Sequence, residues 1–322
     1  MITENIKIFA ASLFLGTLFW LGMNAISKVF ADMFFWNEVA GNPQLYGAQV
    51  LQAPLHLQIK PIKKSEASNF AINAKAALSV FVSEKGKAKI LFQKDADTPF
   101  PIASIAKLMT GLVAIKQYSL DQKITITKEA VQKEEDIGNL RVGEVLSVNS
   151  LLHSMLIESS NDAAEALSGA LGDSQFIRLM NAEAKEVGLE ETFFADSSGV
   201  DPNNQGDPIN VSSARDLFLF AKYIMENHPK IFDILSLPRY TIYTPEGKVH
   251  HVASNTDELL YNPELKVLGG KTGWTPRSQG CLLLLVESPA KNGYIVNVLL
   301  GSENRFEDMK KLVNWAVQSY DF

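Results

Sequence analysis

Alternating and helical patterns of apolar residues predict strands near both ends of the folded part of this chain and helices between them. Two hairpins are expected: residues 77–82 with 89–92 around a glycine-containing turn, and residues 281–287 with 294–300 around an Asn-Gly turn. The expected helices cover residues 105–116, 150–157, 162–171, 174–187, 213–226 and 306–320. This order predicts an α+β fold, an antiparallel sheet flanked by helices with an inserted helical region. Ser213 is the expected N-cap of the fifth helix.

The N-terminal segment, residues 1–36, is expected to be a membrane anchor or a signal segment. No residue from Ile8 to Ser27 is charged, and roughly 20 apolar residues are enough to span a bilayer as a helix. A cleavable signal peptide is the alternative, because residues 29–31 resemble a small-residue cleavage site. The expected location is therefore the cell membrane, with the folded part outside the cytoplasm, or a secreted protein if the segment is cleaved.

A linker and one folded domain are expected after this segment. Residues 37–70 contain prolines and glycine without a sustained helical period, which is typical of an extracytoplasmic tether. Hydrophobic residues make up 46% and charged residues 20% of the 322 residues, so a sizeable core can form. Residues 71–322 are therefore predicted to be one main body that carries the catalytic residues.

Composition argues against several classes of function. The net charge of −6 argues against a nucleic-acid partner, which would usually require a basic face. The single cysteine, Cys281, lies in an apolar run typical of a buried strand, so it is interpreted as a structural thiol. The five histidines are scattered, and adjacent His250 and His251 are expected to point to opposite faces of a strand. No metal and no cofactor are therefore expected.

A Ser-x-x-Lys pattern, Ser104 to Lys107, opens one of the predicted helices. Residues three apart on a helix are neighbours, so the hydroxyl and the amine should meet. Lys107 is the only charged residue from Pro99 to Ile115, and desolvation with a nearby cation would give a neutral amine able to take the serine proton. The alternative is a lysine that reaches along an apolar surface to water beside a capping serine. A second such pattern, residues 288–291, is set aside because it falls in a hairpin turn.

Two further short motifs carry side chains that suit acyl transfer. Ser159 and Asn161 lie between two predicted helices, where a hydroxyl and a carboxamide could relay a proton and hold a substrate amide. Lys271, Thr272 and Gly273 follow two glycines in a predicted strand. Such a strand lets a peptide backbone approach, while the lysine and threonine supply a cation and a hydroxyl for a carboxylate. Each motif is common by itself, but the conjunction with Ser-x-x-Lys is much more specific.

The three motifs together resemble the set found in penicillin-binding proteins and class A β-lactamases. Within that group the chain resembles the low-molecular-mass D-alanyl-D-alanine carboxypeptidases, from about Lys75 to the C-terminus. The likeness rests on residues 101–110, 140–144, 159–164, 212–217 and 270–275. The resemblance implies a β-lactamase/DD-peptidase-like fold, peptidoglycan stem peptides as substrates and β-lactams as covalent inhibitors.

The resemblance also implies roles for individual residues. Ser104 would attack the D-Ala-D-Ala carbonyl, form an acyl-enzyme and release the terminal D-Ala, with Lys107 as its base. Ser159 and Asn161 would serve proton transfer and substrate positioning. The remaining implied residues bind the substrate carboxylate or the oxyanion: Lys271, Thr272, Gly273, the backbone N–H groups of Ser104 and Trp274, and Arg305 as an additional carboxylate ligand.

Departures from the family pattern leave several alternatives open. The family often has Asn-Pro near Asp196-Ser197, so the conformation of this loop is in question. The chain ends soon after the final helix, and this short form also resembles members that cut cross-links between stem peptides, so an endopeptidase is the first alternative. A class A β-lactamase would need a carboxylate for deacylation, for which Asp196, Asp201 and Asp207 are the candidates. A membrane-tethered sensor that binds β-lactams or muropeptides without turnover is a further alternative and would require a partner membrane protein.

Overall fold

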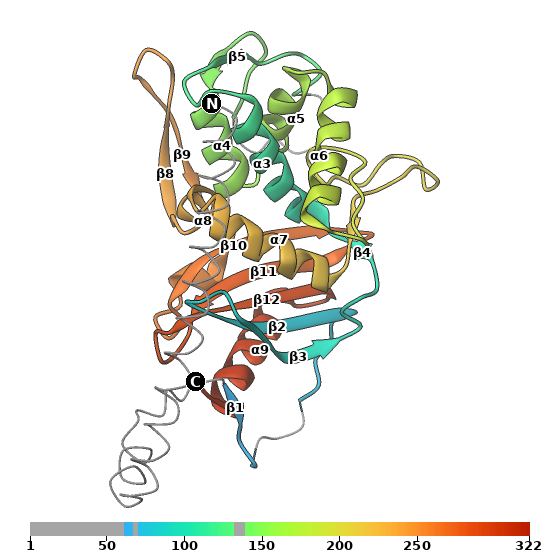
Figure 1. Cartoon of the computed structure of the whole chain (residues 1–322). Coiled ribbons are helices and arrows are strands. Elements are labelled where there is room, and N and C mark those ends of the chain that lie inside the picture. The colour runs from blue at the N-terminus through green and yellow to red at the C-terminus, as the bar shows by residue number, and fades with distance from the viewer. Residues whose placement is uncertain (1–60, 67–69, 132–138) are drawn as a thin grey trace, which may run out of the picture. The chain divides into compact units, whose positions relative to one another are not determined.

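The described part of the chain has the predicted α+β fold, built around one antiparallel sheet. A computed structural model describes residues 61–66, 70–131 and 139–322 (Figure 1). Five strands form the sheet in the order β10-β11-β12-β2-β3, so both predicted hairpins, β2–β3 and β11–β12, are present. The strands are β2 (Ala76–Ser83), β3 (Ala88–Lys94), β10 (Val267–Thr275), β11 (Gln279–Glu287) and β12 (Gly293–Ser302).

The sheet is buried on both faces because its strands place alternate apolar side chains in two cores. In β2, Leu78 and Val80 belong to one core, whereas Ala77 and Phe81 belong to the other. The first core includes residues of α3 to α8, and the second includes one face of α9. A strand buried on both faces is a nearly continuous apolar run, which explains the sequence of β11.

Helices cover the two faces of the sheet (Figure 1). Helix α9 packs on one face, while α7 and α8 lie on the other, between the sheet and a helical region formed by α3 to α6. All six predicted helices are present, whereas α8 was not predicted. The helices are α3 (Lys107–Gln117), α4 (Val148–Ile157), α5 (Asn161–Gly169), α6 (Asp173–Val187), α7 (Ala214–Asn227), α8 (Lys230–Leu235) and α9 (Arg305–Ser319).

Short polar side chains define the ends of several helices. Ser147, Ser160 and Ser213 each accept a hydrogen bond from the backbone N–H three residues later, at the starts of α4, α5 and α7. Ser213 is the predicted N-cap. Gly188 ends α6 with a φ of 81°, the left-handed conformation that glycine adopts at low cost.

Short two-stranded sheets join segments around the main sheet. The pair β4–β7 holds the chain just before Ser104 against the start of α7. The hairpin β8–β9 extends beside α4 (Figure 1). The strands are β1 (Ile62–Lys63) with β13 (Tyr320–Asp321), β4 (Phe100–Pro101) with β7 (Val211–Ser212), β5 (Lys123–Thr125) with β6 (Val145–Ser147), and β8 (Arg239–Tyr243) with β9 (Val249–Ser254).

The adjacent histidines of β9 do not point to opposite faces, so that prediction was wrong. In the β8–β9 ladder, Ile242 pairs with His251 and the next residue, Tyr243, pairs with Val249. His250 is therefore left as the extra residue of a bulge. The two Nδ1 atoms consequently lie 2.6 Å apart. His250 Nε2 lies 3.1 Å from Glu144 Oε2, and His251 Nε2 lies 2.7 Å from Glu158 Oε1. Among the described residues, no group of three or more potential ligands is arranged to hold a metal ion.

The predicted anchor, residues 1–36, and most of the predicted linker lie outside the described residues. Within the described ranges, no helix is long and apolar enough to span a bilayer. Strand β1 falls in the segment predicted to be linker and pairs with β13 next to α9. The described residues belong to one compact unit.

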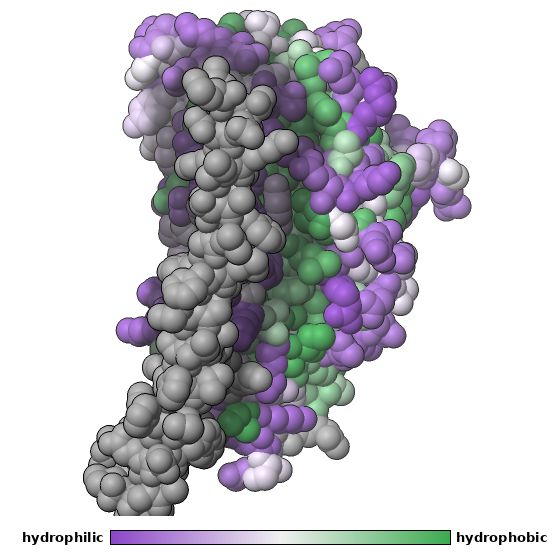
Figure 2. Space-filling model, in the orientation of Figure 1, coloured by the Kyte–Doolittle hydropathy of each residue, from purple (hydrophilic) through white to green (hydrophobic). Residues whose placement is uncertain are grey.

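The described surface is mostly hydrophilic on the face that Figure 2 presents. Apolar residues gather in a band along the middle of this face, over α7 and toward β3 (Figure 2). Leu219 of α7 and Ile90 of β3 are among the exposed apolar side chains.

Candidate active site

Ser104 lies in a short 3-10 helix, η1 (Ala103–Ala106), directly before α3. Ala103 has a φ of 47°, and this left-handed residue leads the chain from β4 into η1. Ser104 is half-buried, whereas Lys107, the first residue of α3, is fully buried. The hydroxyl therefore remains accessible while the neighbouring amine is shielded from water.

Three oxygen atoms surround the amine of Lys107. Its Nζ lies 2.9 Å from Ser104 Oγ, 2.6 Å from Asn161 Oδ1 and 2.6 Å from the carbonyl oxygen of Ser198. An ammonium group can donate a hydrogen bond to each of them. A neutral amine could instead accept the Ser104 proton while it still donates to the other two. The geometry fits a base for the serine and not a lysine that reaches to water along an apolar surface.

Ser159 and Asn161 lie on the tight connection between α4 and α5. Ser159 has a φ of 67°, which is uncommon for a residue with a Cβ. Ser160 caps α5, whose first residue, Asn161, contacts Lys107. Ser159 Oγ in turn lies 2.9 Å from Lys271 Nζ. The structure thus brings together side chains from all three predicted motifs.

Strand β10 carries the third motif beside this connection. Lys271 is 1% exposed, and its Nζ also lies 3.1 Å from the carbonyl oxygen of Thr272. Thr272 Oγ1 lies 2.6 Å from Thr256 Oγ1. Trp274 is 57% exposed, so its indole lies at the surface next to these residues. The strand therefore offers a cation and a hydroxyl, the donors that a carboxylate ligand requires.

Two glycines allow other segments to approach Ser104 closely. A Cβ on Gly273 would lie 3.0 Å from Ile102 O and 3.1 Å from Ser104 N. A Cβ on Gly199 would lie 2.1 Å from Ala103 O, and Gly199 has a φ of 84°. Glycine is required at Gly199 for both the close approach and the left-handed backbone.

The loop that supplies the Ser198 carbonyl oxygen is fixed by two side chains. Asp196 Oδ1 accepts hydrogen bonds from the N–H groups of Ser198 at 2.7 Å and Gly199 at 2.6 Å. Asn210 Oδ1 accepts from the Asp196 N–H at 3.0 Å, and Asn210 Nδ2 donates to the Asp196 carbonyl oxygen at 3.1 Å. The loop therefore has a defined conformation without the Asn-Pro sequence that is frequent in the family.

Arg305 belongs to an element that carries none of the other predicted site residues. It begins α9 beside Gly280 of β11, and its Cζ lies 4.7 Å from the centroid of the Phe306 ring. Its Nε is buried without a hydrogen-bond partner among the described residues. Burial lowers the pKa of Arg305. Its charge nevertheless influences Lys271 across the sheet.

The charges of the site depress the pKa of Lys271. Burial is the largest cause, and the positive charges of Lys107 and Arg305 lower the pKa further. Asp257 opposes them. Neither Asp257 nor Thr256 was identified from the sequence, because the segment before η2 (Glu258–Tyr261) has no recognisable motif and its role depends on tertiary contacts.

The three candidate carboxylates for deacylation have other partners. Asp196 holds the loop beside Lys107. Asp201 accepts hydrogen bonds from Thr275 Oγ1 at 2.9 Å and from the Arg277 N–H at 3.0 Å. Asp207 Oδ2 accepts from Asn204 Nδ2 at 3.0 Å. Each of these carboxylates therefore has a hydrogen-bond partner within the loop or the neighbouring strand.

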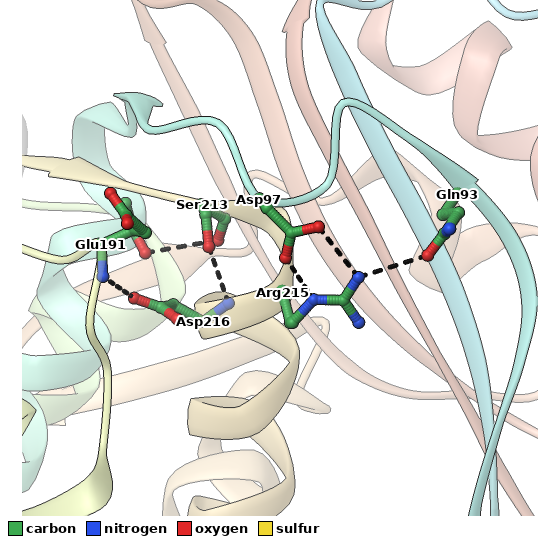
Figure 3. Close-up of polar contacts among 7 residues, drawn as sticks. Gln93, Asp97, Glu191, Ser213, Arg215 and Asp216 are labelled. Atoms are coloured by element: carbon green, nitrogen blue, oxygen red, sulfur yellow. Dashed lines mark hydrogen bonds and ion pairs between the residues drawn. The ribbon is translucent and has the colours of Figure 1, made fainter.

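The segment that begins α7 forms polar contacts in two directions (Figure 3). Arg215 forms an ion pair with Asp97 and donates to Gln93 Oε1 at 3.2 Å. Asp216 points in the opposite direction and accepts from the Glu191 N–H at 2.7 Å. These contacts connect the start of α7 to the segment before β4 and to the segment after α6.

Comparison with known proteins finds matches to peptidoglycan peptidases. A family model described as D-alanyl-D-alanine carboxypeptidase matches residues 63–304. The chain is 30% identical to D-alanyl-D-alanine carboxypeptidase DacC of Escherichia coli over 250 residues, which are 72% of this chain and 59% of DacC. It is 34% identical to a D-alanyl-D-alanine endopeptidase of Haemophilus influenzae over 212 residues, 64% of this chain and 69% of that protein. The chain thus spans less than two thirds of DacC.

Solved structures of penicillin-binding proteins share the fold. Penicillin-binding protein D2 from Listeria monocytogenes, in its ampicillin-bound form, is 30% identical with a TM-score of 0.65, and the match covers 77% of this chain and 99% of that chain. The Streptomyces K15 DD-transpeptidase is 26% identical with a TM-score of 0.67, and the match covers 78% and 99%. These matches extend over nearly the whole of each solved chain.

Proposed function

The chain belongs to the D-alanyl-D-alanine carboxypeptidase family, and we propose that it is a serine hydrolase that removes the terminal D-alanine from peptidoglycan stem peptides. The observation that carries this proposal is the distance of 2.9 Å between Lys107 Nζ and Ser104 Oγ, in a buried site that also contains the Ser159–Lys271 contact. An accessible hydroxyl with a buried amine beside it is the arrangement that an activated serine nucleophile requires.

In the proposed acylation step, Ser104 Oγ attacks the carbonyl carbon of the penultimate D-Ala residue. Its proton passes to Lys107 Nζ, and the carbonyl becomes a tetrahedral oxyanion. Backbone N–H groups of Ser104 and Trp274 are the proposed donors to that oxyanion, and one such donor is typically worth about 3 kcal/mol. The ammonium of Lys107 then returns a proton, through Ser159 Oγ, to the departing amine. The C–N bond breaks, D-Ala leaves, and the peptide remains as an ester on Ser104.

In the proposed deacylation step, water attacks the ester and regenerates the serine hydroxyl. Lys107 takes the proton of the attacking water and returns it to Ser104 Oγ, so no proton is gained or lost over the cycle. The Ser198 carbonyl oxygen and Asn161 Oδ1 support this exchange, because each lies 2.6 Å from Lys107 Nζ and accepts a hydrogen bond whether the amine is charged or neutral.

Recognition of the terminal carboxylate is proposed to depend on β10. Lys271 supplies a positive charge, Thr272 supplies a hydroxyl, and Gly273 keeps the strand close to the nucleophile. Trp274 provides an exposed aromatic surface next to them. Arg305 would contribute long-range attraction, since it has no side-chain hydrogen bond to the other site residues that are described.

The direct test is covalent labelling of the full chain by benzylpenicillin, measured by intact mass spectrometry with peptide mapping. We expect a long-lived adduct on Ser104 and D-Ala release from a stem pentapeptide, with both lost in Ser104→Ala. Ser288→Ala is the matched control, because Ser288 begins the second Ser-x-x-Lys pattern but lies in the turn after β11. An adduct that persists in Ser104→Ala would refute the assignment of the nucleophile.

An endopeptidase that cuts cross-links is the second candidate. The Haemophilus influenzae relative named an endopeptidase supports it, since the chain spans 69% of that protein but 59% of DacC. The two activities differ in what lies beyond the scissile bond: a free D-Ala or a residue that belongs to another stem peptide. Competition between a monomeric pentapeptide and a cross-linked dimer, followed by chromatography, would distinguish them.

We also propose that residues 8–27 hold the protein in the cell membrane with the catalytic unit outside the cytoplasm. The uncharged apolar sequence of this segment supports the proposal. Fractionation of cells that express the full chain or a chain lacking residues 1–36 tests it. Recovery of the full-length protein in the soluble fraction would contradict an anchor.

A further inference from the structure

A short segment outside the three motifs lies directly against the substrate-binding strand. Thr256 contacts Thr272 of β10 through the two hydroxyl groups, and the Thr256 N–H donates to the carbonyl oxygen of Ile157 at the end of α4. Asn255 anchors the segment, since its Nδ2 donates to two carbonyl oxygens near the end of α8 and its Oδ1 accepts from the Asp257 N–H at 2.9 Å. The next side chain, Asp257, is therefore held in one place.

The carboxyl group of Asp257 is buried with only one oxygen atom satisfied. Asp257 is 0% exposed. Oδ1 accepts a hydrogen bond from the Leu259 N–H at 3.0 Å and caps η2. Oδ2 has no hydrogen-bond partner among the described residues. A buried carboxylate oxygen without a donor is costly, so a favourable charge interaction is required to offset it.

Glycine at position 270 creates the space for this oxygen. A Cβ on Gly270 would lie 2.5 Å from Asp257 Oδ2 and 3.0 Å from a methyl carbon of Leu284, which belongs to the core formed with α9. The carboxylate therefore lies against the α9 side of β10. Lys271, the next residue of β10, is directed to the other side, where it contacts Ser159.

The charged groups around Asp257 come from three elements. The charges that act on it are those of Lys271 in β10, Arg305 in α9 and Glu258 in η2. The two cations favour the carboxylate, whereas Glu258, which is exposed, opposes it. Burial outweighs these charges and raises the pKa of Asp257 to about 6, so the group is ionised at neutral pH. In that form it counteracts the burial and the neighbouring cations that depress the pKa of Lys271.

We propose that Asp257 is a positioning residue that keeps Lys271 in its ammonium form by placing a negative charge behind β10. The carboxylate touches no substrate and acts through Lys271 alone. This role rests on the proposed function in one respect, that the Lys271 ammonium binds the substrate carboxylate. A residue on the opposite side of β10, in the space that Gly270 leaves, thus controls the charge state of Lys271.

The test compares Asp257→Asn with Glu258→Gln in the full chain. Each variant removes one negative charge at adjacent positions, but Asp257→Asn retains a side-chain oxygen that can cap η2. The first readout is the titration of Lys271, followed by NMR of ¹³Cε-labelled lysine and assigned by loss of the signal in Lys271→Arg. In Asp257→Asn we expect the Lys271 midpoint to fall by about one pH unit or more, the size of effect that a nearby opposite charge produces. In Glu258→Gln it should stay close to that of the wild-type protein.

The second readout is the pH profile of acylation by benzylpenicillin and of D-Ala release. The alkaline limb of kcat/KM should move to lower pH in Asp257→Asn, mostly through KM, because the lysine that binds the carboxylate loses its proton earlier. If Asp257→Asn is poorly folded, Asp257→Ser replaces it, since serine also caps helices and lacks the charge.

An unchanged Lys271 midpoint in the folded variants would overturn this role and leave Asp257 as a helix cap only. A pH-independent loss of activity with that midpoint unchanged would do the same. Failure of the proposed function is recognised separately, by a wild-type protein that neither forms the Ser104 adduct nor releases D-Ala. The NMR titration does not depend on activity.

Discussion

The contact between Gly199 and the nucleophile segment gives the sharpest stability prediction. Replacing Gly199 by alanine places a Cβ 2.1 Å from Ala103 O and 2.9 Å from Ser104 N, both backbone atoms that cannot rotate away. The φ of 84° adds about 1–2 kcal/mol for a side chain in the left-handed region. Relief of the clash should cost about 1–3 kcal/mol more, as is typical of overpacked cores. We expect Gly199→Ala to lower the free energy of unfolding by ~2–5 kcal/mol.

Gly188→Ala provides the matched control for this change. Gly188 has a φ of 81°, but a Cβ there would have no neighbour within 4 Å. It should therefore show the backbone cost alone, about 1–2 kcal/mol, and leave acylation of Ser104 unchanged. Urea unfolding measures the free energies, and the rate of benzylpenicillin labelling measures the site. The reasoning is refuted if Gly199→Ala is no more destabilising than Gly188→Ala and is labelled at the wild-type rate.

Three further predictions concern groups outside the reacting atoms. Asp216→Ala should lower the free energy of unfolding by ~1–3 kcal/mol, because it removes a buried carboxylate that accepts a hydrogen bond from the Glu191 N–H. Arg215→Ala removes an exposed ion pair and should change the free energy of unfolding little. Equal losses of the two variants in urea unfolding would contradict this contrast. Burial lowers the pKa of His153 below 6.5, so the unfolded state binds the proton first and the protein loses stability as the pH falls below about 6.5. His153→Phe, which can still stack on Tyr240, should reduce the dependence of the free energy of unfolding on pH in this range. An unchanged pH dependence would refute the assignment of this effect to His153. Burial raises the pKa of the Cys281 thiol to about 11, so a disulfide reagent at pH 8 should label the thiol only after unfolding. Rapid labelling of the native protein would instead show that strand β11 opens.

Local patterns in the sequence predicted most of the sheet and the helices. The turn containing Gly86 and the Asn-Gly turn at the start of β12 mark the two hairpins that the structure contains. The spacing of Ser104 and Lys107 predicted their contact, because residues three apart meet at the start of a helix. Interactions within a few residues of each other therefore account for the predicted elements, whereas the resemblance to a known family led us to expect the meeting of the three motifs.

The features that the sequence did not reveal depend on contacts between distant segments. A bulge at His250 reverses the side-chain direction that strict alternation predicts, and nothing local in β9 signals it. The Ser198 carbonyl oxygen reaches Lys107 only because Gly199 packs against Ala103. Asp257 acquires its place from Gly270, 13 residues later in the printed sequence. Single residues of common types carry these roles, so no short pattern identifies them.

On the proposed function, the close packing of Gly199 and Gly273 against residues 102–104 limits how this protein could evolve resistance to acylating antibiotics. Steric exclusion of a bulky drug usually requires larger side chains near the nucleophile, yet at these two positions the first added carbon meets backbone of residues 102–104. A side chain at Gly199 would displace the segment that carries Ser104, and one at Gly273 would press tightly against it. Escape variants should therefore arise at the exposed rim, where the 57% exposed Trp274 can change size or shape without disturbing the segment that carries Ser104.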